Sequence, residues 1–339
     1  MAKIAVVGAG SWGTALAQTL ADGGNEVVMW ARKADVARSI TENHRNPRYL
    51  SGVMLHPAIT ATDDLARCVD GAQAIAIVVP SRLIRSFASD LALLVSPQTP
   101  IVICSKGVEE RTGLLPIQVF ERVLGGIDRL AALSGPNHAE EVVLGIPAGT
   151  VIASASYETA GYFRDLFATP RFRCYTSFDY VGVELCAAFK NVIAIAVGAA
   201  YGSGLGDNTA AMLMTRGMAE MSRLVTACGG EALTVMGLAG AGDLIATCTS
   251  EHSRNRTFGR ALAQGGSLAA FEERTHMVVE GAQACKAIGA LAERHGVELP
   301  ITEAVRAMVW EGASLADLSE ELINRPLKTE FWGLGKSGE

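Results

Sequence analysis

The sequence predicts an α/β protein in which an N-terminal domain with a mainly parallel sheet precedes a C-terminal all-helical domain. Over residues 1 to about 180, short apolar runs alternate with amphipathic stretches, which is the pattern that βαβ units produce. From about Asp179 onward the strand signals vanish, and long segments rich in Ala, Leu and Met follow one another. We therefore expect one domain at residues 1–180 and a second at residues 181–335.

The elements of both domains follow from the spacing of their apolar residues. The expected strands are Ile4–Val7, Glu26–Trp30, Ala74–Val79, Ile101–Ser105, Ala131–Ser134 and Thr150–Ala153. The expected helices of the first domain are Thr14–Ala21, Leu83–Leu94 and Leu114–Leu124. In the second domain the clearest helices are Leu185–Ala200, Ala210–Cys228, Gly281–His295 and Ile301–Trp310.

The composition is that of a soluble globular protein. Hydrophobic residues make up 49% of the 339 residues and charged residues 19%, which excludes disordered and low-complexity classes. The formal charge of -6 provides no global basic field that would attract nucleic acid or an anionic membrane. The most apolar stretch, Leu185–Ala200, contains Lys190 and Asn191, so a buried core helix is favoured over insertion into a membrane.

The cysteines and the N-terminus indicate a cytoplasmic protein. The seven cysteines are odd in number and widely spaced, with no CxxC pair, which predicts reduced core thiols and neither a disulfide framework nor a metal site. Met1–Ile4 enters a strand pattern directly, without the pattern of a signal peptide. The apolar helical domain makes a homodimer reasonable, although the sequence does not show which surface would pair.

A GxGxxG motif, Gly8-Ala9-Gly10-Ser11-Trp12-Gly13, lies directly between the first predicted strand and the first predicted helix. In dinucleotide-binding units of the Rossmann type, the first glycine permits a tight turn, the second lets the pyrophosphate approach, and the third packs helix on sheet. A purely structural glycine-rich turn is the alternative. The sequence of strand, motif, helix and second strand favours a dinucleotide site at Gly8, Gly10 and Gly13.

Basic residues follow two of the predicted strands. Arg32 and Lys33 come after the second strand, where many NAD-binding domains carry an acidic residue that accepts hydrogen bonds from the ribose. A cation pair can bind a 2′-phosphate instead, which favours NADPH over NADH, unless the two residues are simply solvated at the start of the next helix. Lys106 follows a later strand and is expected to contact a phosphate, with an ordinary surface lysine as the alternative.

Three polar features in the second domain are candidates for catalysis and binding. Lys190 lies in a helix with almost no other polar residue, and burial of an ammonium lowers its pKa, which makes it a competent proton donor. The alternative is a lysine whose tip reaches water. Asp243, among glycines and apolar residues, is expected to orient Lys190 or to cap the following helix. The cluster Ser253-Arg254-Asn255 is suited to a phosphate, although arginines are more often surface residues.

Taken together, these motifs resemble those of the bacterial NAD(P)-dependent glycerol-3-phosphate dehydrogenases, in the same order over nearly the full chain. The motifs that carry the resemblance are Gly8–Ala17, Ser105–Gly107, Ser134–Val142, Lys190–Ile195, Thr215–Ser222, Gly240–Asp243, Ser253–Asn255 and Val278–Gly281.

The resemblance implies reduction of dihydroxyacetone phosphate to sn-glycerol 3-phosphate for phospholipid synthesis, with hydride from NADPH or NADH and Lys190 as proton donor. By the same resemblance, the cofactor would be lined by Ser11, Trp12, Arg32, Tyr49, Lys106, Ala139, Arg254, Val278 and Glu280. The substrate would be held by Lys106, Gly135, Asn137, Lys190, Asp243, Ser253, Arg254 and Asn255.

One motif departs from the family. Asn137 and His138 stand where the family usually reads Ser-Gly-Pro-Ser or Thr-Phe-Ala, although Asn137 can still donate and accept hydrogen bonds. His138 is not expected to be catalytic, because Lys190 is available. Related dehydrogenases of the 3-hydroxyacid, 6-phosphogluconate and ketopantoate types pair the same two domains and are the main alternative. A catalytically silent dinucleotide sensor is a weaker one.

Overall fold

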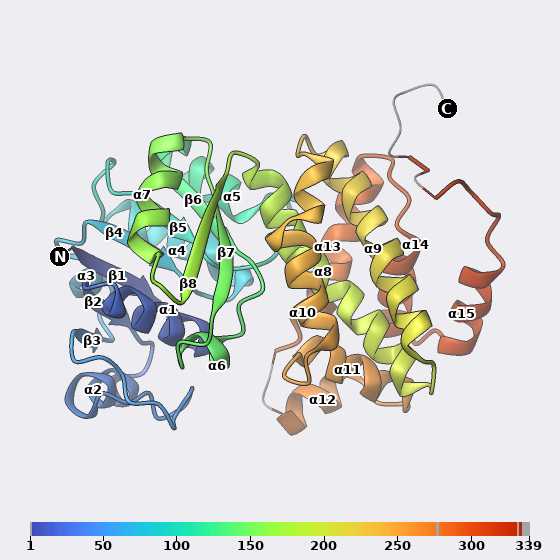
Figure 1. Ribbon diagram of the computed structural model, residues 1–339, viewed down its shortest axis with the longest axis horizontal. Coiled ribbons are helices and arrows are strands. Elements are labelled where there is room, and N and C mark those ends of the chain that lie inside the picture. Colours follow the sequence, from blue (N-terminus) through green and yellow to red (C-terminus); the bar gives the residue numbers. More distant parts are fainter. Residues whose placement is uncertain (1, 276–277, 331, 334–339) are drawn as a thin grey trace. The chain divides into compact units, whose positions relative to one another are not determined.

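The computed structural model describes residues 2–275, 278–330, 332 and 333 (Figure 1). They divide into two compact units. The first unit consists of the residues up to Lys106 together with Pro116–Tyr180, and the second of Gly107–Leu115 together with the residues from Val181 onward. The sequence assigned Gly107–Leu115 to the first domain. In the structure this segment belongs to the second unit, because Val108 and Leu115 are buried in its core.

An eight-stranded sheet forms the centre of the first unit, with the strand order β3-β2-β1-β4-β5-β6-β7-β8. The strands are β1 (Lys3–Val7), β2 (Glu26–Trp30), β3 (Ile59–Thr62), β4 (Ala74–Ile77), β5 (Ile101–Ile103), β6 (Leu130–Ser134), β7 (Ala148–Ala153) and β8 (Phe172–Ser177). Every neighbouring pair is parallel except β6 with β7. The predicted Rossmann-type, mainly parallel sheet is therefore confirmed.

The sequence predicted six of these strands and missed β3 and β8, which are the two edges of the sheet. Both edge strands are partly exposed, and only the first residue of each is buried. An edge strand is covered on fewer sides, so it does not need the continuous apolar run that marks β1 or β4 as a central strand.

Helices cover both faces of this sheet. They are α1 (Ser11–Asp22), α2 (Ala34–Asn43), α3 (Leu65–Val69), α4 (Ile84–Ala92), α5 (Pro116–Leu124), α6 (Ala139–Val142) and α7 (Tyr157–Phe167), with short 3₁₀ turns at Ser81–Leu83 and Ile127–Arg129. Helices α1, α6 and α7 pack together on one face, and α4 packs with α5 on the other (Figure 1). From β1 the chain proceeds toward β3 in one direction along the sheet, and from β4 it proceeds toward β6 in the other. Because crossovers between parallel strands are right-handed, the helices of these two halves lie on opposite faces.

The described residues of the second unit form helices joined by loops, with no strand among them. Its helices are α8 (Tyr180–Gly202), α9 (Asp207–Ala227), α10 (Asp243–Thr249), α11 (Arg254–Ala263), α12 (Leu268–Thr275), α13 (Glu280–Arg294), α14 (Pro300–Arg306) and α15 (Leu315–Ile323), with a 3₁₀ turn η3 (Ala232–Met236) and π-helical turns η4 (Leu238–Gly242) and η5 (Ala307–Glu311). Helix α8 is long and apolar enough to cross a membrane, but 89% of its most apolar stretch is buried inside the protein. It is the central helix of this core.

Two glycines let α8 and α11 cross with their backbones in contact. A Cβ atom on Gly198 of α8 would lie 2.0 Å from the Arg256 carbonyl oxygen, and one on Gly259 of α11 would lie 2.1 Å from the Ile195 carbonyl oxygen. No larger residue fits at either position without moving a helix. The close crossing also places Asn255, at the start of α11, beside α8.

Candidate active site

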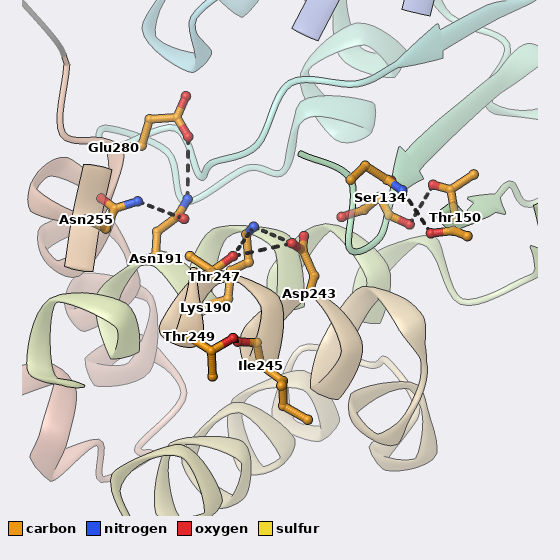
Figure 2. Close-up of polar contacts among 12 residues, drawn as sticks. Ser134, Thr150, Lys190, Asn191, Asp243, Ile245, Thr247, Thr249, Asn255 and Glu280 are labelled. Carbon is orange, nitrogen blue, oxygen red and sulfur yellow. Dashed lines mark hydrogen bonds and ion pairs between the residues drawn. The ribbon is translucent and has the colours of Figure 1, made fainter. Parts of the chain in front are cut away.

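Lys190 lies on α8 with only 6% of its surface exposed. Its Nζ donates to Asp243 Oδ1 at 2.5 Å and to Thr247 Oγ1 at 2.7 Å, and the Thr247 hydroxyl donates to Asp243 Oδ1 at 3.4 Å (Figure 2). Burial of a charged group is tolerated when an opposite charge and hydrogen bonds compensate it. Lys190 is therefore a buried, paired ammonium held by α10 and does not extend its tip into solvent.

The glycines before α10 explain how Asp243 reaches this position. A Cβ atom on Gly240 would lie 2.1 Å from the Val235 carbonyl oxygen, so η4 can fold tightly on η3 only with glycine there. Helix α10 then begins at Asp243, where the partial positive charge of a helix N-terminus favours a carboxylate. Thr247 follows four residues later on the same face of the helix. One turn of α10 thus presents both partners of Lys190.

Asn191, the next residue on α8, connects two further helices (Figure 2). Its Oδ1 accepts from Asn255 Nδ2 at 2.9 Å, and its Nδ2 donates to Glu280 Oε2 at 3.4 Å. Asn255 Oδ1 in turn accepts from the Gly281 backbone N–H at 2.9 Å. A side-chain amide carries two N–H groups, so Asn255 can still donate one hydrogen bond to a ligand.

The other predicted residues of the second unit lie at helix starts. The buried Ser253 caps α11, because its hydroxyl accepts from the Arg256 backbone N–H at 3.3 Å. Arg254 is the exposed first residue of that helix. Val278 is also exposed and lies just before α13.

The glycine motif of the first unit forms the turn between β1 and α1. Gly8 has a φ of +126°, and a Cβ there would lie 2.3 Å from the Val78 carbonyl oxygen. A Cβ on Gly13 would lie 2.0 Å from the Gly8 carbonyl oxygen, whereas one on Gly10 would meet no atom within 4 Å. Gly8 and Gly13 are thus required by the fold itself, and Gly10 leaves an open surface at the N-terminus of α1. This cradle fits the pyrophosphate of a dinucleotide.

Most remaining residues of the predicted cofactor and substrate sites follow the carboxyl ends of parallel strands, which share one edge of a sheet. Ser11 and Trp12 begin α1 after β1, the exposed Arg32 and Lys33 follow β2, and Lys106 follows β5. Gly135, Asn137 and Ala139 follow β6. Tyr49 comes from the loop between α2 and β3, where 46% of its surface is exposed.

The loop after β6 is tied to β7 by two side chains. Thr150 Oγ1 donates to the Ser134 carbonyl oxygen at 3.0 Å (Figure 2), and Asn137 Nδ2 donates to the Gly149 carbonyl oxygen at 2.9 Å. Asn137 Oδ1 is buried, and the described residues provide no hydrogen-bond donor to it. The Asn137 amide nitrogen thus fixes the loop, while its oxygen is left as an acceptor.

Three residues that bond to predicted site residues or to the glycine turn were not themselves among the predicted site residues. Thr247 could have been found from its spacing of four residues from Asp243 on a predicted helix. The sequence indicates Asn191 as the polar neighbour of Lys190, but it assigns no role to this side chain. Asn46, a buried residue that contacts the glycine turn, has no distinguishing pattern in the sequence.

Family profiles match both parts of the chain. The profile described as NAD-dependent glycerol-3-phosphate dehydrogenase N-terminus matches residues 3–160, and the one described as its C-terminus matches residues 179–320. The chain belongs to this family. The resemblance seen in the sequence motifs is therefore confirmed.

Individual relatives agree with this assignment over their full length. The chain is 48% identical over 324 residues to a glycerol-3-phosphate dehydrogenase [NAD(P)+] from Moorella thermoacetica, covering 96% of each sequence. It is 46% identical over 332 residues to one from Corynebacterium urealyticum, covering 97% of this chain and all of the relative. It is also similar to the crystal structure of glycerol-3-phosphate dehydrogenase from Coxiella burnetii, with a TM-score of 0.91, 36% identity, and coverage of 96% of this chain and 99% of that one.

Proposed function

We propose that the protein reduces dihydroxyacetone phosphate to sn-glycerol 3-phosphate with NAD(P)H. The observation that carries this proposal is the buried Lys190, whose Nζ is held by Asp243 and Thr247 in a chain of the NAD-dependent glycerol-3-phosphate dehydrogenase family. The full-length match favours this activity over those of the 3-hydroxyacid, 6-phosphogluconate and ketopantoate enzymes, and over a silent sensor.

Lys190 acts as the proton donor in this reaction. When bound, the reduced nicotinamide supplies a hydride to the carbonyl carbon of the substrate. Negative charge then develops on the carbonyl oxygen, and the Lys190 ammonium stabilises it and transfers a proton to it. Asp243 and Thr247 fix the position of Nζ, so little reorganisation is needed as the charge develops.

The substrate phosphate is bound by Arg254 and Asn255 at the start of α11. Guanidinium binds phosphate through two parallel hydrogen bonds, and Asn255 retains one amide hydrogen for a ligand. Ser253 supports both residues by capping the helix. Binding energy from the phosphate orients the carbonyl that reacts.

We further propose that a dinucleotide binds at the glycine turn of Gly8, Gly10 and Gly13, with Ser11, Trp12, Tyr49 and Ala139 of the same unit as further contacts. We propose a preference for NADPH, because the exposed Arg32 and Lys33 follow β2 where an acidic residue would otherwise bind the ribose hydroxyls. We place the enzyme in the cytoplasm, where its product supplies phospholipid synthesis. A homodimer through the helical unit is consistent with the exposed apolar side chains of Leu233 and Met236.

The reaction is tested by following NADPH and NADH absorbance with dihydroxyacetone phosphate, using wild type, Lys190→Ala and Lys286→Ala. Lys286 lies in the same unit on α13 and contacts the Trp310 ring, so its variant controls for removal of a lysine. We expect Lys190→Ala to lose roughly 10² to 10⁴ in kcat with cofactor binding retained. Equal rates in wild type and Lys190→Ala would remove Lys190 from the mechanism. Turnover of 3-hydroxyacids in place of dihydroxyacetone phosphate would refute the proposed substrate.

A further inference from the structure

Asn46 lies in the loop between α2 and β3 and is only 1% exposed. Its Nδ2 donates to the Ala9 carbonyl oxygen at 3.0 Å and to Thr14 Oγ1 at 2.8 Å. Its Oδ1 accepts from the backbone N–H groups of Arg48 at 3.1 Å and Tyr49 at 3.2 Å. All four hydrogen bonds that an asparagine side chain can make are therefore formed, and they join two segments that are far apart in sequence.

The bond to Ala9 fixes the glycine turn at the peptide between Ala9 and Gly10. The Ala9–Gly10 peptide is planar and trans, so its carbonyl and its N–H point in opposite directions. Because Asn46 holds the Ala9 carbonyl, it also fixes the direction of the Gly10 N–H. The surface at Gly10 is open, and the N–H groups at this helix N-terminus are the ones that bind anions.

The bonds to Arg48 and Tyr49 fix the other segment. Tyr49 has an exposed side chain, and the Arg48 guanidinium lies 3.3 Å from Asp35 in the first turn of α2. That turn directly follows Arg32 and Lys33. One buried amide thus sets both the turn for the pyrophosphate and the loop beside the basic residues after β2.

We propose that Asn46 is a positioning residue for the adenosine diphosphate half of the dinucleotide. It acts through the Gly10 N–H on one side and through the Tyr49 loop on the other. The identity of the ligand rests on the proposed function, but the role of Asn46 is tested by binding alone and does not depend on turnover. Because these bonds lie within the protein and hold both the turn and the loop, Asn46 lowers the cost of ordering the site when the cofactor binds.

The test compares Asn46→Ala and Asn46→Asp with Asn25→Ala. Asn25 is a buried asparagine of the same unit that accepts from the Ala2 backbone N–H and donates to the Leu20 carbonyl oxygen, far in sequence from the Tyr49 loop. Titrations measure Kd for NADPH, for ADP-ribose and for reduced nicotinamide mononucleotide. We expect both Asn46 variants to bind NADPH and ADP-ribose about tenfold to a hundredfold more weakly, with the mononucleotide unchanged.

Asn46→Asp keeps the size of the side chain and its acceptor oxygen, so it provides a folded variant if Asn46→Ala does not fold. Its second oxygen would face the Ala9 carbonyl oxygen and repel it, so the turn is misplaced even when the loop is held. Unchanged Kd values in either folded variant would overturn the proposal, as would an equal loss in Asn25→Ala. Wild-type NADPH binding without turnover of dihydroxyacetone phosphate would refute the proposed reaction and leave the role of Asn46 intact.

Discussion

The hydroxyl of Thr247 lies 2.7 Å from Lys190 Nζ and 3.4 Å from Asp243 Oδ1, so the proposed proton donor has two partners from one turn of α10. The carboxylate compensates the charge of the ammonium, while the hydroxyl accepts a second hydrogen bond from it in another direction. Two bonds at different angles restrict the rotation of a long, flexible side chain more than one does. In the proposed reaction, this fixed ammonium would need little reorganisation to stabilise the oxyanion of the substrate.

Thr247→Val should lower kcat by about tenfold, because it removes the hydroxyl bond to Lys190 and keeps the shape of the side chain. Thr247→Ser retains the hydroxyl and should recover most of the rate. Cofactor affinity should be the same in all three proteins. Steady-state kinetics with saturating NADPH checks this, and an unchanged kcat in Thr247→Val would show that Asp243 alone positions the lysine.

Arg32→Ala should lower the ratio of kcat/KM for NADPH to kcat/KM for NADH by about tenfold, because a cation at this position attracts the 2′-phosphate that only NADPH carries. Arg38→Ala is the matched control, since Arg38 is an exposed arginine in the nearby helix α2. The ratio is measured at two salt concentrations, and the preference should weaken at the higher one. Equal ratios in wild type and Arg32→Ala would argue against a 2′-phosphate site at Arg32.

Gly259→Ala should destabilise the helical unit by roughly 1 to 3 kcal/mol, because the added methyl group would lie 2.1 Å from the Ile195 carbonyl oxygen. Gly289→Ala is the control within the same unit. Its Cβ would meet its nearest neighbour, Arg306 Cδ, only at 3.9 Å, so alanine should stabilise α13 by about 0.5 to 1 kcal/mol. Urea denaturation measures both changes. Similar stabilities for the two variants would mean that α8 and α11 can separate without cost.

The sequence predicted those parts of the fold and site whose signals are local. The six central strands are mostly apolar, and β4 and β5 are wholly so. The glycines of the β1–α1 turn are needed for backbone conformation and packing. Both features leave a clear pattern in the sequence. Lys190 stands out in the sequence because it places a charge in an otherwise apolar helix. The family could be recognised because its motifs recur in order along the whole chain.

What the sequence could not show depends on contacts between distant segments. Asn46 is one polar residue in a polar loop, and only the folded chain reveals that it binds Ala9 and Thr14. The edge strand β8 exposes much of its surface, so its pattern resembles a loop. Asn191 makes its contacts with residues more than 60 positions away. The roles of the individual site residues in binding and catalysis stay predictions.

Glu220 should make the stability of the helical unit depend on pH near neutrality. It is buried on α9, and its carboxylate accepts from the backbone N–H groups of Ile301 at 2.6 Å and Thr302 at 3.3 Å, which caps α14. Burial raises its pKa from 4.5 to about 7, against the opposing effects of these N–H bonds and of the Arg223 charge. The folded protein therefore holds a proton that the unfolded chain releases in this range.

The raised pKa fixes the sign of this dependence. Because the folded state binds more protons than the unfolded state between pH 4.5 and about 7, stability falls as pH rises through this window. Relative to Glu220→Gln, which cannot titrate, the wild type should lose roughly 2 to 3 kcal/mol of unfolding free energy between pH 5 and pH 8. Urea denaturation of both proteins at several pH values measures the difference. Parallel pH profiles would show that Glu220 keeps its charge in the fold and that its N–H partners outweigh its burial.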